Sequence, residues 1–397
     1  MTAPDQKTDR IVELDALRGF AVIGIVLMNV YVFALPAQAY YNPIAWGGEG
    51  PMDRLLWVFG FVFIEDKFRT LFAMLFGVGC MILLEKTGSR AWRAHYARMV
   101  VLLAIGVIHA TLFASNDVLR AYALAGLALP FLAQLSARAL IAVAVGLVAV
   151  HIGGGINLFG STVFDWLAGR TNSDVVFVAE RNFGSDQASV QAMLERGREG
   201  FGERVFRRVA EIPLQIKVVA GSIPLNLAAM ALGIALWRDG MLAGEWRTFR
   251  LQRLAAICAM IALPCLFWLA WWVGDYGFPG ALVGPTSLIL SAPFDLALGV
   301  AYAASAMALF ASRGPATERL AAVGRLSLTN YLMTSVILAA IFASWGLGLF
   351  GYVSRSEAFA LSFVPIAAML VWSPIWAGKL GQGPFERIWR AVARLLS

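Results

Sequence analysis

Apolar runs recur along the chain, separated by short segments rich in charged residues and turn formers. A helix needs about 20 apolar residues to cross a hydrocarbon core of about 30 Å. The runs therefore predict an all-α, polytopic membrane bundle of about ten transmembrane helices, at about 16–35, 56–84, 99–114, 117–135, 138–155, 212–237, 252–273, 287–311, 323–348 and 357–377.

Three segments depart from this regular pattern. The second run is too long for one straight span, and Glu65, Asp66 and Lys67 interrupt it, which predicts a broken or interfacial segment before the crossing helix. Residues 156–211 form a polar connection that we expect outside the cytoplasm, with an amphipathic helix that is either a structural cap or a lid over a substrate opening. The apolar stripe of that helix is Val190, Met193, Leu194, Gly197, Phe201 and Val205. Residues 380–397 predict a basic amphipathic helix suited to the inner surface of an anionic bilayer.

Composition supports the membrane assignment. Of the 397 residues, 59% are hydrophobic and 14% are charged, with a mean hydropathy of +0.71, whereas soluble domains have about 25% charged residues. The net charge of +7 could indicate nucleic acid, but in a membrane protein it more often reflects Lys and Arg that anchor cytoplasmic loops. The connections 36–54, 114–120, 274–286 and 349–356 carry just Arg54, Arg120 and Arg355. We therefore expect a single transmembrane domain, 1–397, with both termini in the cytoplasm, in contact with the lipid bilayer and with no nucleic-acid partner.

Familiar catalytic motifs do not occur. The sequence lacks GxxxxGK[ST], HExxH and GxSxG, which argues against an ATP-driven pump, a zinc protease of that type and a serine hydrolase of the elbow type. Its three cysteines have no metal-ligand spacing, so we expect no metal.

Ionisable residues within the spans cost roughly 2.5–3.5 kcal/mol each on insertion scales, so they are candidates for function. In LDALRGFAVIGIVLMNV (14–30), Asp15 and Arg18 are neighbours on one helix face. Arg18 and Asn29 share a face about 16 Å apart along the axis. The alternative is a capping ion pair and an amide that joins two helices.

A second polar stretch is EDKFRTLFAMLFG (65–77). A pair between Glu65 and Arg69, four residues apart, would leave Lys67 and Asp66 less committed. Lys67 and Arg69 could then bind an anionic group, or they could extend towards lipid headgroups.

His109 lies inside an apolar run, and Asp117 follows in a short loop. Direct contact between the two requires the turn after His109 to fold back. A buried histidine that merely bonds a neighbouring helix is the alternative. We expect His95 to be a solvated interfacial ring and His151 to cap a helix end.

Further polar residues occur near the C-terminus. Asp295 would begin a helix, where the dipole favours an acidic residue, or would orient an imidazole. Arg325 is expected near the inner surface, and Asn330 and Tyr331 follow in GRLSLTNYL.

Five stretches carry a family resemblance: LDALRGFAVIGIVLMNV, DKFRTLFAMLFGVG, GVIHATLFASNDVLRAYALAGLAL, GRLSLTNYLMTSVI and GPFERIWR. Together they resemble the YeiB-like family of bacterial inner-membrane proteins over residues 14 to about 390. That family is similar to the transmembrane acyltransferase superfamily, which includes heparan-α-glucosaminide N-acetyltransferase and bacterial polysaccharide O-acetyltransferases.

The superfamily pattern of an Arg followed by a His or Asn matches Arg18 and Asn29. Where the heparan enzyme has its catalytic His, this sequence has Tyr40, which leaves His109 as the replacement base.

The resemblance implies acyl transfer from a cytoplasmic thioester, with acyl-CoA as the candidate donor, to a small-molecule or glycan acceptor at the outer face. In this scheme Arg18 and Arg325 attract the donor, His109 removes a proton, Asn29 stabilises the oxyanion, and Lys67 and Arg69 orient the acceptor. The candidate catalytic residues are His109, Asn29 and Asp117, and the candidate substrate-binding residues are Arg18, Asp15, Lys67, Arg69, Asp295, Arg325 and Asn330. A proton-linked transporter of a small metabolite is the competing interpretation, and a homodimer is left open.

Overall fold

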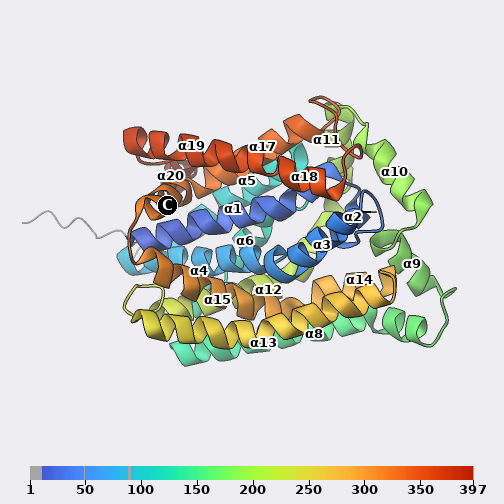
Figure 1. Ribbon diagram of the computed structural model, residues 1–397. Helices are drawn as coiled ribbons and strands as arrows, with labels where there is room; N and C mark the ends of the chain where they lie inside the picture. Colours follow the sequence, from blue (N-terminus) through green and yellow to red (C-terminus); the bar gives the residue numbers. More distant parts are fainter. Residues whose placement is uncertain (1–10, 49, 88–90, 397) are drawn as a thin grey trace, which may run out of the picture.

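The computed structural model describes residues 11–48, 50–87 and 91–396, and every regular element in these ranges is helical (Figure 1). Eight continuous helical stretches are long and apolar enough to cross a membrane, so the predicted all-α membrane bundle is confirmed. Six of them are the single helices α1 (Val12–Ala34), α5 (Ala91–Leu112), α8 (Ala137–Leu167), α12 (Ile212–Arg238), α13 (Thr248–Asp275) and α15 (Ala292–Phe310). The other two stretches are composite: α3 (Pro51–Phe59), the π-helix η1 (Gly60–Ile64) and α4 (Lys67–Thr87), and then α18 (Arg355–Leu361) with α19 (Phe363–Leu380).

Two further segments that hydropathy predicted as spans are not single continuous helices. Helices α16 (Pro315–Arg325) and α17 (Ser327–Phe342) meet at an angle of 80°. The predicted span 117–135 forms the short helices α6 (Val118–Gly126) and α7 (Leu129–Leu132). This segment nevertheless runs alongside α12. Arg120 on α6 donates to Gln215 near the start of α12, and Arg238 at the end of α12 donates to carbonyl groups just after α7.

The predicted interruption of the second run is confirmed. The chain breaks at Glu65 and Asp66, and Asp66 has a φ of +60°, a left-handed conformation that Asp adopts more readily than most residues. Phe68 lies against Gly24, halfway along α1. Helix α4 therefore begins near the middle of the bundle, and its first turn carries charged residues to that depth.

Helices approach most closely where both carry small residues. A Cβ on Gly324 of α16 would lie 1.8 Å from the carbonyl oxygen of Asp15, and one on Gly19 would lie 2.1 Å from that of Leu320. Such glycine contacts let membrane helices pack backbone against backbone. They hold α1 and α16 together, and so fix Asp15, Arg18 and the end of α16 relative to one another.

The two ends of the bundle differ (Figure 1). The start of α1 and the C-terminal helix α20 (Pro384–Leu396) lie at one end, here called the basic end. Helices α9 (Asp174–Phe183), α10 (Gln187–Gly197) and α11 (Phe201–Ala210) lie at the other, the distal end. The short elements that complete the fold are α2 (Ala37–Tyr41), α14 (Gly280–Pro285) and the π-helix η3 (Thr286–Leu290).

The polar connection differs in detail from the sequence prediction. Residues 156–167 belong to α8, which is longer than the expected span 138–155. The predicted amphipathic stripe is divided between α10 and α11 rather than lying on one helix. The C-terminal amphipathic helix is present as α20, and it docks against α5 through Trp389.

Candidate functional site

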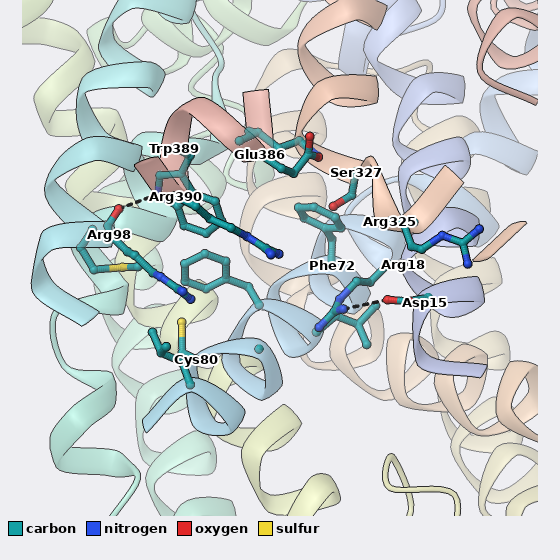
Figure 2. Close-up of a pocket in the computed structure, with 17 residues that line it drawn as sticks. Asp15, Arg18, Phe72, Cys80, Arg98, Arg325, Ser327, Glu386, Trp389 and Arg390 are labelled. Atoms are coloured by element: carbon teal, nitrogen blue, oxygen red, sulfur yellow. Dashed lines mark hydrogen bonds and ion pairs between the residues drawn. The ribbon is translucent and has the colours of Figure 1, made fainter. Parts of the chain in front are cut away.

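A cavity of about 220 Å³ lies at the basic end, between α1, α4, α5, α16, α17 and α20 (Figure 2). Its lining includes four arginines from four helices, namely Arg18, Arg98, Arg325 and Arg390. Figure 2 shows the guanidinium groups of Arg98 and Arg390 turned towards its centre and that of Arg325 turned away. Guanidinium groups bind phosphate and carboxylate through paired hydrogen bonds, so this cavity suits an anionic ligand.

The arginines outnumber the carboxylates available to neutralise them. Asp15 pairs with Arg18 at 3.1 Å. Glu386 of α20 instead accepts hydrogen bonds from the backbone N–H groups of Leu328 and Thr329, at 2.8 and 3.1 Å, and from the Thr329 hydroxyl. Its carboxylate thus caps the first turn of α17. Among the described residues that line the cavity, four arginines stand against two carboxylates, so the formal charge of this lining is positive.

Sequence reasoning anticipated Arg18, Asp15 and Arg325 here but missed the contribution of α20. The indole N–H of Trp389 donates to the carbonyl of Arg98 at 2.9 Å, and the Arg98 guanidinium lies 5.9 Å from the Trp389 ring centre. The aromatic and basic residues of the C-terminal helix were the available signal. Their spacing predicts an amphipathic helix but does not indicate that it contacts the bundle.

An aromatic layer closes the deep side of the cavity. Phe72 and Phe76 line it, and their ring centres lie 6.0 and 5.5 Å from that of Tyr122. Leu328 also lines the cavity, and Tyr331 lies one turn farther along α17. His109 lies on α5 about three turns beyond Met99, which also lines the cavity.

His109 and Asp117 form a buried pair. The Nδ1 atom of His109 lies 2.8 Å from Oδ1 of Asp117, and the Tyr331 hydroxyl donates to the same oxygen at 3.1 Å. The histidine is 3% exposed and the aspartate 4%. His109 and Asp117 are therefore in direct contact across the turn that joins their helices, and Tyr331 on α17 bonds the same carboxylate.

The turn between α5 and α6 makes this contact possible. Asp117 caps α6 by accepting from the backbone N–H of Arg120 at 3.1 Å. A Cβ on Gly106 would lie 2.8 Å from Asp117 Oδ2 and 2.9 Å from that N–H nitrogen. Glycine at this position thus lets α6 fold back against α5 and bring the carboxylate to His109.

The pair has the arrangement of a general base. A carboxylate accepts hydrogen bonds, so Nδ1 of His109 carries the proton and Nε2 keeps its lone pair. Among the described residues, the buried Nε2 atom has no hydrogen-bond partner. A carboxylate that fixes the tautomer of an imidazole whose other nitrogen is available is the logic of catalytic triads.

A second buried pair lies near mid-depth. Lys67 Nζ is 2.6 Å from Asp295 Oδ1 and also donates to the carbonyl of Phe61. The Ser291 hydroxyl donates to the other oxygen of Asp295 at 2.7 Å. Both charged side chains are about 1% exposed. Asp295 thus partners an ammonium rather than an imidazole, and Lys67 is enclosed.

Arg69 differs from Lys67 in its exposure. It pairs with Asp66 at 3.0 Å, not with Glu65 as the spacing suggested. The Arg69 side chain is 34% exposed, although α4 packs between α1, α5, α12 and α15. Its backbone carbonyl accepts from the Tyr122 hydroxyl at 2.8 Å. Arg69 is therefore the more accessible of the two basic side chains in the first turn of α4.

The remaining predicted residues lie apart from these groups. The Asn330 amide donates to the carbonyl of Val323 and to the Ser373 hydroxyl, at 2.9 and 3.0 Å, so it joins α17 to α19. Asn29 is half-buried on α1, and no hydrogen bond of its amide occurs within the described part of the chain. His95 is buried and bonded to the carbonyl of Gly126 at 2.8 Å, so the expectation of a solvated ring was wrong.

His151 is also placed differently from the prediction. It lies in the middle of α8, bonded to the carbonyl of Leu288 at 2.9 Å, rather than at a helix end. In the described ranges, His, Cys, Asp and Glu residues form no group that could hold a metal ion.

Fold and site together define a multi-pass membrane protein with an arginine-lined cavity at one end and a buried Asp–His pair deeper in the bundle. The chain is 32% identical to "Uncharacterized protein YeiB" of Escherichia coli (strain K12), over 97% of this chain and 96% of the relative. It is 28% identical to "Uncharacterized protein YxaH" of Bacillus subtilis (strain 168), over 99% and 96% respectively. Residues 236–395 match the family described as "Protein of unknown function (DUF418)". The chain therefore belongs to the YeiB-like family, and no solved structure matches it.

Proposed function

We propose that the protein is a membrane-embedded acyltransferase that moves an acyl group from a thioester donor at the basic end to an acceptor at the distal end. One observation carries the proposal. About 16 Å beyond Arg98, at ~1.5 Å per residue of α5, lies His109, whose Nε2 atom is free and whose Nδ1 atom is held by Asp117. An anion-binding cavity followed by a positioned base is what such a transfer requires.

The donor in this scheme is acyl-CoA. Its phosphates would bind Arg98, Arg18 and Arg390 at the basic end, and its acyl arm would extend past the aromatic layer. The cavity volume of about 220 Å³ is below the roughly 300–1,000 Å³ of ordinary ligand pockets. Binding therefore requires α20 or the layer of Phe72 and Phe76 to move. Because Lys and Arg concentrate on the cytoplasmic side of bacterial membrane proteins, we propose that the basic end faces the cytoplasm and that the membrane is the inner one.

The chemical step is a displacement at the thioester carbonyl. The Nε2 atom of His109 removes the proton of an acceptor hydroxyl or amine as the acceptor attacks the carbonyl carbon. The carbon–sulfur bond then breaks, and the proton passes to the leaving thiolate. Asp117 stabilises the transient imidazolium. Arg69 is better placed than Lys67 to bind the acceptor, because its side chain is 34% exposed whereas Lys67 is buried in its pair with Asp295.

The experiment follows acetyl-CoA consumption by the purified protein, with a membrane extract as the source of acceptor. We expect His109→Gln to abolish release of free CoA and to leave donor binding intact. Arg98→Gln should instead weaken donor binding. His151→Gln on α8 is the matched control, because it changes a histidine distant from both groups. Unchanged CoA release by His109→Gln would refute the proposal.

A proton-linked carrier is supported by a different observation. The Lys67–Asp295 pair lies near mid-depth, where transporters often place coupling residues. Such a carrier would move substrate across proteoliposomes without consuming a thioester, and Lys67→Met would impair uptake. Uptake that survives Lys67→Met would exclude this pair from transport.

A further inference from the structure

A second concave surface lies between α3 and α13. It encloses about 410 Å³, within the roughly 300–1,000 Å³ typical of ligand pockets. Trp57 contributes from α3, and Phe267, Trp271 and Gly274 contribute from α13. The three α13 residues follow helical spacing, so they form one continuous face. We call this surface the α3–α13 groove.

A specific backbone conformation at Phe278 shapes the floor of the groove. Phe278 has a φ of +59°, which is strained for an aromatic residue. The Asn42 amide donates to the carbonyl of Phe278 at 2.9 Å and holds this conformation. As a result the Phe278 ring packs edge-on against Trp57, with ring centres 4.9 Å apart.

Two opposite charges lie at one end of the groove. Arg54 belongs to the first turn of α3, and Asp275 is the last residue of α13. Phe63 and Phe267 lie side by side, with ring centres 5.8 Å apart. Arg54 precedes Phe63 by about as many residues as Asp275 follows Phe267. Both charged side chains therefore lie at about the same depth. In the described part of the chain they do not form an ion pair with each other or with any other residue.

We propose that the α3–α13 groove binds a phospholipid that carries both a phosphate and a primary ammonium group, as phosphatidylethanolamine does. Arg54 binds the phosphate, and Asp275 binds the ammonium. From Asp275 to Phe267 the groove runs about 12 Å at ~1.5 Å per residue, and this apolar length accepts part of one acyl chain. Tryptophans such as Trp57 and Trp271 are typical of the level where headgroups meet hydrocarbon.

The neighbouring surface supports a lipid as the occupant. Phe267 and Trp271 are 45% and 61% exposed, and Leu55 and Met52 on α3 are 60% and 58% exposed. Apolar side chains this exposed on a membrane protein face acyl chains. An unpaired cation and anion at the end of such a surface match a zwitterionic headgroup better than either an anionic lipid or a purely apolar partner.

The test measures lipid retention by native mass spectrometry. The full-length protein is equilibrated with an equimolar mixture of dioleoyl phosphatidylethanolamine, phosphatidylcholine and phosphatidylglycerol. We expect the wild type to retain phosphatidylethanolamine preferentially. Asp275→Asn should lower that preference roughly tenfold, to the level of phosphatidylcholine, because phosphatidylcholine cannot donate a hydrogen bond from its ammonium group. Arg54→Gln should weaken retention of all three lipids.

A steric variant separates the groove from ordinary surface lipid. A Cβ on Gly274 would lie 3.6 Å from the Phe278 ring, so Gly274→Leu fits the backbone and extends into the groove. Gly153→Leu is the matched control, because nothing lies within 4 Å of a Cβ there. We expect Gly274→Leu, but not Gly153→Leu, to remove the retained lipid. Equal retention of the three lipids, no response to Asp275→Asn, or a protein dimer in place of the lipid would each overturn the proposal.

Discussion

Replacing Asp117 by asparagine tests how the buried carboxylate acts on His109. The carboxylate accepts three hydrogen bonds, from His109 Nδ1, from the Tyr331 hydroxyl and from the backbone N–H of Arg120. The first two converge on Oδ1 and the third on Oδ2. An asparagine has one carbonyl oxygen, so one position must carry an NH₂ group that faces a donor.

The magnitudes decide which position loses its acceptor. Losing the cap of α6 costs about 1 kcal/mol. Losing the His109 and Tyr331 bonds, one of them to a group that becomes charged, costs about 2–4 kcal/mol. The asparagine carbonyl should therefore stay with His109 and Tyr331. The imidazole keeps its tautomer, and what the protein loses is the negative charge.

That charge should matter most in the transition state. An imidazolium and a carboxylate with charge centres about 4 Å apart interact by about 4 kcal/mol at an effective dielectric constant of about 20. Each 1.36 kcal/mol corresponds to about tenfold in rate. Asp117→Asn should therefore lower kcat for acyl transfer by roughly 10³-fold and leave KM for the donor unchanged, because the arginines that bind it are untouched.

The assay compares acetyl-CoA turnover and thermal unfolding of this variant with those of Asp239→Asn. Asp239 is an exposed carboxylate that pairs with Arg250 at 3.1 Å, so it controls for the loss of one charge. A kcat within about tenfold of the wild type would show that Asp117 does not stabilise an imidazolium. A parallel rise in donor KM would show that the effect is not confined to His109.

Three further predictions test the packing around these groups. Gly324→Ala should destabilise the bundle by about 1–3 kcal/mol, because its Cβ would lie 1.8 Å from the Asp15 carbonyl oxygen. Gly314→Ala is the control, because nothing lies within 4 Å of a Cβ there. Thermal unfolding measures the stability of both variants. Glu386→Ala leaves two backbone N–H groups of α17 without their acceptor, at about 1–3 kcal/mol each, so α20 should become sensitive to limited proteolysis. Burial raises the pKa of Glu180 on α9 above its ordinary 4.5, so the folded protein keeps this proton to higher pH than the unfolded chain. Its contribution to stability is present below pH 4.5 and is lost as pH rises through the raised pKa; Glu180→Gln should remove that slope from unfolding measured against pH.

Much of the fold could be predicted because the hydropathy of a segment indicates how deep in the bilayer it lies. Hydropathy located the crossings, and the charged residues at Glu65 and Asp66 marked the break. The contact between His109 and Asp117 was foreseeable because both residues flank one turn. In each case the determining interactions are local, or they depend on depth alone.

What could not be predicted is which helices lie side by side. Lys67 forms an ion pair with Asp295, more than 200 residues later in the chain, and the carbonyl of Arg98 accepts a hydrogen bond from Trp389 of α20. Lateral packing in a membrane depends on close contacts between small residues and on particular hydrogen bonds, and hydropathy reports neither. His95 could not be placed for the same reason. Its ring belongs to a basic segment, yet it is buried and bonded to the carbonyl of Gly126 on α6.

The position of Tyr122 bears on the choice between an enzyme and a carrier. Its ring packs against Phe72 and Phe76, which line the cavity with the four arginines, and its hydroxyl donates to the backbone carbonyl of Arg69. A carrier must move a whole substrate through this layer and must therefore separate the rings widely. A transferase must admit just a thin acyl arm, and its two substrates approach from opposite sides. Closely packed rings beside the arginine-lined cavity therefore support the proposed group transfer over the proposed transport.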